Sequence, residues 1–132
     1  MKQTYEDAVL KCVLWWSDKS FRTPLNQNNG DDSPQGSMAF ARMNMVALSA
    51  QQKVTDEKIK KFEDKLIELL LQAKTRYEKT LSVDYGPCTL LAEAADFAEL
   101  EYACFPCKTH SFIEDNNEVY VKYQYGGELV KL

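Results

Sequence analysis

The most regular pattern in the chain runs from Thr55 to Thr80, where apolar residues recur at intervals of three and four positions. This spacing places the apolar side chains along one stripe of an α-helix, and the charged residues between them face water. Thr55 is a suitable N-cap because its hydroxyl can accept a hydrogen bond from a backbone N–H of the first turn. The pattern predicts one uninterrupted helix over 55–80, on which we expect the remaining elements to pack. Its apolar stripe comprises Ile59, Phe62, Leu66, Leu69, Leu70, Ala73 and Tyr77.

A second helical pattern covers residues 4–20. Thr4 and Asp7 have the spacing of a capping box, in which each side chain accepts a hydrogen bond from the backbone of the other residue. The apolar side of this helix is wide, so we expect it to be buried on two sides. Its two adjacent tryptophans cannot face the same partner, and we expect one in the core and one at a rim. The additional apolar patch comprises Leu10, Leu14 and Trp15.

Residues 22–36 are rich in Asn, Asp, Gly, Pro and Ser, a composition that predicts a loop. Residues 37–53 combine alanines and methionines at helical spacing and predict another helix. Its short connection to the helix over 55–80 predicts an antiparallel helical hairpin. Because the first two helices are apolar on more than one side, we expect the protein to self-associate.

The last part of the chain changes from helical to alternating patterns. Residues 87–100 predict a short alanine-rich helix, with Pro87 in its first turn. Beyond it, Val119 and Val121 alternate with Tyr120 and Lys122, as on the two faces of a strand. Strands are predicted at 111–115, 118–125 and 128–132, separated by the turn pairs Asn116-Asn117 and Gly126-Gly127.

These patterns predict the α+β fold class within a single domain over 1–132. The helical part, 1–80, includes the long helix 55–80 in a helical hairpin. The α-β part, 81–132, consists of a short helix and a C-terminal three-stranded antiparallel β-meander. Such a meander needs a helix to cover one face, and the alanine-rich helix or the long helix can supply it.

Composition narrows the classes of function. The 132-residue chain is 45% hydrophobic, which suits a globular core, and carries a formal net charge of −4. A general nucleic-acid binder needs a basic field, so direct, sequence-independent nucleic-acid binding is disfavoured. We find no secretory signal and no apolar run of membrane-spanning length, and we expect a cytoplasmic protein with no membrane contact. In that compartment the four cysteines should be thiols or metal ligands.

The densest group of reactive side chains lies between Cys104 and His110, and it allows three interpretations. The first is a Cys₃His zinc site, whose ligands would be Cys88, Cys104, Cys107 and His110. Alternatively, Cys104 and Cys107 could be a redox dithiol, although the motif follows a helix and lacks the preceding strand of such sites. The third interpretation is packing, because cysteine is among the most buried residue types. We take packing as the starting hypothesis, and no cofactor other than zinc is indicated.

A second candidate site combines cations, a hydroxyl and aromatic rings in the α-β part. If these side chains converge, they would suit a nucleotide-like anionic ligand, since cations hold anions and rings stack on bases. The aromatic residues are equally explained as ordinary strand residues. The candidate ligand-binding residues are Phe105, Lys108, Thr109, Lys122, Tyr123 and Tyr125.

No pattern of catalytic residues accompanies the single histidine, His110, so an enzyme is not predicted. The leading hypothesis is a non-catalytic binding or inhibitory protein that acts on a protein partner as a homo-oligomer, as small accessory proteins of viral or mobile-element type do. The alternatives are a sequestering module for a nucleotide-like anionic ligand and a zinc-stabilised Cys₃His interaction module.

Overall fold

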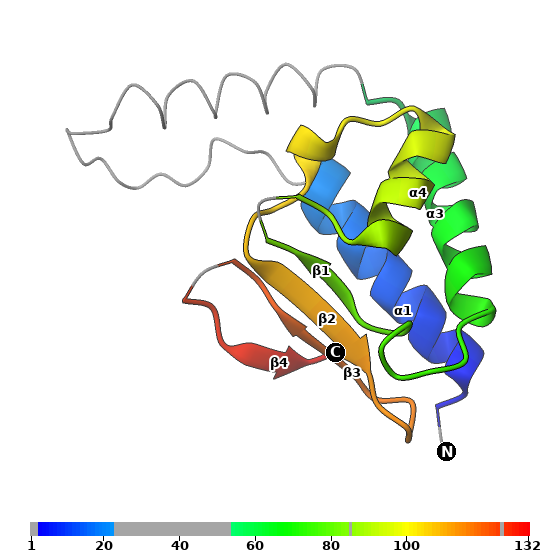
Figure 1. Ribbon diagram of the computed structural model, residues 1–132, viewed down its shortest axis with the longest axis vertical. Coiled ribbons are helices and arrows are strands. Elements are labelled where there is room, and N and C mark those ends of the chain that lie inside the picture. Colours follow the sequence, from blue (N-terminus) through cyan, green and yellow to red (C-terminus); the bar gives the residue numbers. More distant parts are fainter. Residues whose placement is uncertain (1–2, 23–53, 85, 125) are drawn as a thin grey trace.

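The computed structural model describes residues 3–22, 54–84, 86–124 and 126–132 (Figure 1). The helix predicted over 37–53, residues 23–36 of the predicted loop and Tyr125 lie outside the described residues, so the hairpin stays a prediction. The elements are α1 (Tyr5–Ser17), the π-helical turn η1 (Asp18–Arg22), α3 (Asp56–Leu71), β1 (Leu81–Val83), α4 (Thr89–Ala98), the 3-10 turn η2 (Tyr102–Cys104), β2 (Thr109–Ile113), β3 (Val119–Lys122) and β4 (Leu129–Lys131). None of the described helices has the length and apolarity needed to cross a membrane.

The fold is α+β, as predicted, but the sheet has four strands instead of three. Its order is β1-β2-β3-β4, and each neighbouring pair is antiparallel. The additional strand is β1, whose Leu81 and Val83 lie opposite Ser111 and Thr109 of β2. β1 is only three residues long, and α4 lies between it and β2 along the chain. The alternation within β1 therefore did not show that this strand belongs to the same sheet.

The helices cover one side of the sheet (Figure 1). α1 packs on β2 and β3, α4 packs on β1, and α3 packs on both α1 and α4. Phe62, Leu66 and Leu70 of α3 are fully buried, so the predicted apolar edge of this helix is confirmed. The expectation that every element packs on α3 was wrong, because α1 and α4 make the main helical contacts with the sheet.

The long helix ends at Leu71, so its predicted extension to Thr80 was wrong. Gln72 caps it, and the chain then forms a separate turn in which Thr75 and Glu78 bond reciprocally. The Glu78 carboxylate accepts from the Thr75 backbone N–H at 3.1 Å, and the Thr75 hydroxyl accepts from the Glu78 N–H at 3.2 Å. This pair is a capping box, which begins a new helical turn and ends the old one. Tyr77, predicted in the buried stripe, is consequently 88% exposed.

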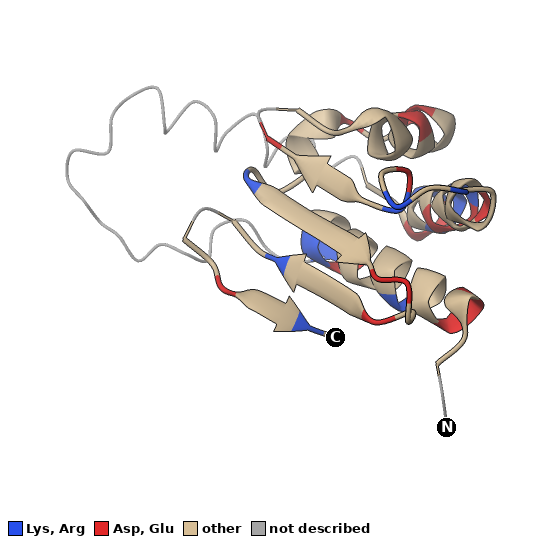
Figure 2. Cartoon of the chain, turned by 60° about the horizontal axis from the view of Figure 1, so that its bottom comes forward, with Lys and Arg blue, Asp and Glu red and all other residues tan. Residues whose placement is uncertain are grey.

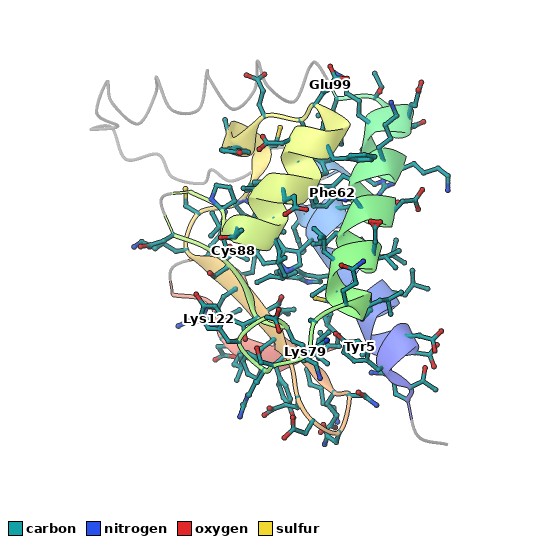
Figure 3. The ribbon with its side chains drawn as sticks, turned by 45° about the vertical axis from the view of Figure 1, so that its right-hand side comes forward. Tyr5, Phe62, Lys79, Cys88, Glu99 and Lys122 are labelled. Atoms are coloured by element: carbon teal, nitrogen blue, oxygen red, sulfur yellow. The ribbon has the colours of Figure 1, made fainter. Side chains whose placement is uncertain are left out.

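Tyr5 fixes the end of α3 from the first turn of α1. Its hydroxyl donates to the backbone carbonyl of Leu70 at 2.5 Å. Lys79 Nζ lies 4.7 Å from the centroid of the same ring, and Figure 3 shows the two side chains close together below α3. A helix C-terminus leaves its last carbonyls without intrahelical partners, and the Tyr5 hydroxyl satisfies one of them.

α1 begins as predicted, and its predicted burial is confirmed only in part. Thr4 and Asp7 form the capping box in both directions. Trp16 is fully buried, and its indole N–H donates to the Ser111 hydroxyl at 2.7 Å, whereas Trp15 is partly exposed. The additional apolar patch is only half covered by described residues, since Leu10 and Leu14 are 47% and 45% exposed.

The turn residues have the backbone conformations that their types favour. Asn117 and Gly126 have positive φ angles of 68° and 84°, as predicted for the two turn pairs. Gly127 is required for space, because a Cβ atom there would lie 2.2 Å from the Tyr123 carbonyl oxygen. α4 begins later than predicted, at Thr89, because Pro87 forms a bridge with Val83 instead of the first helical turn.

Candidate binding site

An open cleft of about 570 Å³ lies where β1, β2 and β3 meet the turn before β4. Three of the six predicted ligand-binding residues, Lys108, Thr109 and Lys122, line this cleft. They come together because the register places Lys122 opposite His110 and Ser82 on the other side of His110. The lining residues are Ser82, Val83, Asp84, Lys108, Thr109, His110, Lys122, Gln124 and Gly126.

Two of these three predicted residues are already engaged by the protein. Lys108 forms an ion pair with Asp84, so its charge is largely neutralised within the cleft. The Thr109 hydroxyl donates to the Cys107 carbonyl at 3.1 Å and accepts from the Gln124 N–H at 3.0 Å. Thr109 is also almost fully buried, at 1% exposure, so it holds the turn in place and does not face a ligand.

Phe105 and Tyr123, the predicted aromatic residues that the structure describes, do not line the cleft. Phe105 is buried against Phe21 and Phe62, with ring centroids 5.8 and 5.9 Å away. Tyr123 lies on the helical side, where its ring packs edge-on against Trp15 at 6.2 Å and burial raises its pKa. Tyr125 is outside the described residues. The described lining of the cleft therefore offers no aromatic ring on which a base could stack.

Besides Lys108, the basic residues that line the cleft are His110 and Lys122. They are direct neighbours on β2 and β3, on the sheet face away from the helices. Among the described residues, neither side chain forms an ion pair or a hydrogen bond to another side chain. His110 was predicted only as a metal ligand. Its alternation with the buried Thr109 and Ser111 indicates the outer face of the sheet, and the strand register then places it opposite Lys122.

The four predicted zinc ligands are not gathered into one site. Within the described parts of the chain, which include Cys88, Cys104, Cys107 and His110, no three Cys, His, Asp or Glu residues form a group that could hold a metal ion. All four cysteines are free thiols. Burial raises the pKa of Cys104 to about 11, which favours the thiol over the thiolate that zinc requires. This placement agrees with the packing interpretation for Cys104, and Cys107 is exposed.

A second candidate surface is the outer edge of β4. The Leu132 N–H donates to the Val119 carbonyl at 2.9 Å, so Val119 and Leu132 form a hydrogen-bonded pair in this ladder. Since such pairs alternate along antiparallel strands, Val130 bonds to β3 while the backbone groups of Leu129 and Lys131 point away from it. Leu129 and Val130 are also 53% and 51% exposed.

The opposite edge of the sheet is closed by the chain itself. On β1, the Ser82 carbonyl accepts from the Cys88 N–H at 2.9 Å, and the Ser82 N–H donates to the Cys88 thiol at 3.4 Å. Within the described residues, β4 is therefore the edge at which the sheet can be extended by another strand.

No protein-family model and no curated protein matches this chain.

Proposed function

We propose that this protein is a non-catalytic binding protein that acts through protein–protein contacts and as a homo-oligomer. The observation that carries the proposal is the β4 edge, which combines outward-pointing backbone groups with two half-exposed apolar side chains. An edge of this kind pairs readily with a strand from another chain.

A second copy of the chain fits the β4 edge geometrically. If two β4 strands pair around a two-fold axis at Val130, Leu129 of each copy faces Lys131 of the other. Both of these residues direct their backbone groups outward, so each facing pair can exchange two hydrogen bonds. The two Val130 side chains then meet on the axis and lose their exposure. Because β1 is closed by Cys88, such pairing ends at a dimer and does not continue into a fibre.

The experiment is sedimentation equilibrium over a hundredfold range of protein concentration. We expect the wild type to show concentration-dependent dimerisation, and Val130→Asp to weaken it by at least tenfold because a carboxylate would be placed at the axis. Leu71→Asp is the matched control, since Leu71 is 47% exposed on α3 and lies away from β4. A wild type that remains monomeric, or a Leu71→Asp effect as large as that of Val130→Asp, would contradict the proposal.

The second candidate function is sequestration of an anionic small ligand in the cleft. It is favoured by His110 and Lys122, two neighbouring cationic or potentially cationic groups without a described ionic partner. A ligand that binds only the folded state must raise the melting temperature. The test is a thermal-shift panel of inorganic phosphate, pyrophosphate and nucleotides. Lys122→Glu should abolish any shift and Lys58→Glu, on α3, should leave it; a flat panel removes this candidate.

A further inference from the structure

The outer side of α4 and the residues after it are rich in acidic residues. Residues 89–102 contain four acidic residues and no Lys, Arg or His, so this segment contributes −4, which equals the formal net charge of the whole chain. Figure 2 shows acidic positions and no basic ones along α4, whereas α3 carries both signs. We name this region the α4 surface, and it comprises Glu93, Asp96, Phe97, Glu99, Glu101 and Tyr102.

Helical geometry brings the acidic groups together with an exposed aromatic ring. Glu93, Asp96 and Phe97 are spaced by three and four positions and lie on the side of α4 opposite its buried residues. Phe97 is 57% exposed, an unusual exposure for a phenylalanine. Leu91, Ala94, Ala95 and Ala98 form the buried side.

Tyr102 extends the same surface beyond the end of α4. Its hydroxyl donates to both oxygens of the Asp96 carboxylate, at 2.8 and 2.9 Å, and its ring is 43% exposed. This hydrogen bond raises the pKa of Tyr102, so the phenol stays neutral and keeps donating. The aromatic rings of Phe97 and Tyr102 thus flank a carboxylate whose position is fixed.

Three of these carboxylates, those of Glu93, Asp96 and Glu99, have no ionic partner within the described part of the chain. Among the described residues, no ion pair joins Glu93, Asp96 or Glu99 to a cation. Lys65 Nζ lies 5.3 Å from the Phe97 ring centroid and already pairs with Glu68 at 3.3 Å.

Glu99 adds a carboxylate at a position where the backbone favours glycine. It has a left-handed φ of 61° at the C-terminus of α4, and the Leu100 N–H returns to the Ala95 carbonyl at 2.9 Å. This is a Schellman motif, in which glycine usually occupies the left-handed position. Figure 3 shows Glu99 at the end of α4 furthest from the sheet, where its carboxylate extends the negative surface.

We propose that the α4 surface docks a basic, partly apolar segment of a partner protein. Lysine or arginine side chains of that segment pair with the carboxylates of Glu93, Asp96 and Glu99, and an apolar side chain covers Phe97. Charge complementarity selects this class of partner and repels nucleic acid. The inference rests on the proposed function only in taking the protein as a binding protein, since the α4 surface and the β4 edge share no residue.

The test uses a synthetic 14-residue amphipathic peptide of lysine and leucine, titrated calorimetrically into the full chain at 0.15 M salt. We expect a Kd below about 100 μM for the wild type. Glu93→Lys should weaken binding by about tenfold or more, because it replaces an attraction by a repulsion. Phe97→Ala should weaken it by a similar factor of about ten without changing the charge.

Two control variants separate local docking from general attraction. Asp115→Lys changes the net charge as Glu93→Lys does, but it lies in the turn between β2 and β3. Leu71→Ala removes an exposed apolar side chain from α3 as Phe97→Ala does from α4. Both controls should change the Kd by less than about twofold. The proposal is overturned by an absence of peptide binding, by an equal effect of Asp115→Lys, or by a Phe97→Ala variant that binds as well as the wild type.

The result of the peptide titration does not depend on whether the chain dimerises through β4. A chain that binds the peptide on the α4 surface but sediments as a monomer would refute β4 pairing and support the docking inference. A dimer that is lost in Val130→Asp, combined with no peptide binding, would give the reverse result.

Discussion

The substitution Ser111→Ala tests the polar contact that joins α1 to the centre of the sheet. Ser111 is fully buried on β2, and its hydroxyl accepts from the Trp16 indole N–H at 2.7 Å. The same hydroxyl lies 3.4 Å from the Cys12 sulfur. Alanine keeps the backbone and the Cβ atom but removes the only acceptor that the described structure gives to this indole N–H.

The expected loss follows from the burial of both partners. Because Trp16 is also fully buried, water cannot replace the lost acceptor. A buried donor left without a partner costs about 1–3 kcal/mol, and the weak contact with Cys12 adds little. We expect Ser111→Ala to reduce the free energy of unfolding by about 2 kcal/mol, a large share of the total for a domain of this size.

The assay is urea denaturation of four proteins: the wild type, Ser111→Ala, Trp16→Phe and the double variant. Phenylalanine has no N–H, so Ser111→Ala should cost less in the Trp16→Phe background, with a coupling energy of about 1–2 kcal/mol. Additive effects within about 0.5 kcal/mol would show that the hydrogen bond does not hold α1 to the sheet.

Three further predictions concern the core, the thiols and the end of α4. Phe62→Ala should cost about 3–5 kcal/mol in urea denaturation, because Phe62 is fully buried and its ring contacts Phe21 at 5.0 Å. Burial raises the pKa of Cys12 to about 11, above the ordinary value of 9.0 for an accessible thiol, so the folded state favours the neutral form. The stability that comes from keeping this thiol neutral is fully present below pH 9 and is lost as the pH rises from about 9 to 11. The urea midpoint of the wild type should therefore fall over that range of pH, and the midpoint of Cys12→Ala should fall less steeply. Glu99→Gly should raise the free energy of unfolding by up to about 1 kcal/mol, because glycine adopts the left-handed conformation without a Cβ clash, and Glu99→Gln should leave it nearly unchanged.

Most of the fold could be predicted from two local rules, one for where helices begin and one for the alternation of side chains along strands. Thr4 and Thr55 both cap their helices as predicted, since an N-cap depends on residues within three positions of one another. Val119 and Val121 face the helices while Tyr120 and Lys122 face away, because alternation on a strand is also local. One missed local signal was the capping box formed by Thr75 and Glu78, which follows the end of α3 and has a recognisable spacing in the sequence.

Features that depend on distant parts of the chain were predicted less well. β1 is three residues long, and its membership of the sheet depends on β2, which lies beyond α4. The candidate ligand set mixed Lys122 with Phe105 and Tyr123, because residue type alone does not show which side of the sheet each side chain occupies. The structure separates them: Lys122 lies at the cleft, whereas Phe105 packs in the core and Tyr123 packs against Trp15.

The exposure of β4 follows from the order in which the elements occur. α4 connects β1 to its neighbour β2, so its short connections hold it over the β1 side of the sheet. Among the described elements, α1 covers β2 and β3, and β4 lies at the edge of the sheet beyond both helices. Its neighbour β3 satisfies one edge of β4, while Leu129 and Val130 stay half exposed on its two faces. Apolar side chains on an uncovered edge strand favour association, because pairing buries them and satisfies the outward backbone groups together. Among the described residues, the same arrangement leaves the outer side of α4 uncovered, so the proposed β4 edge and the proposed α4 surface lie at opposite edges of the sheet.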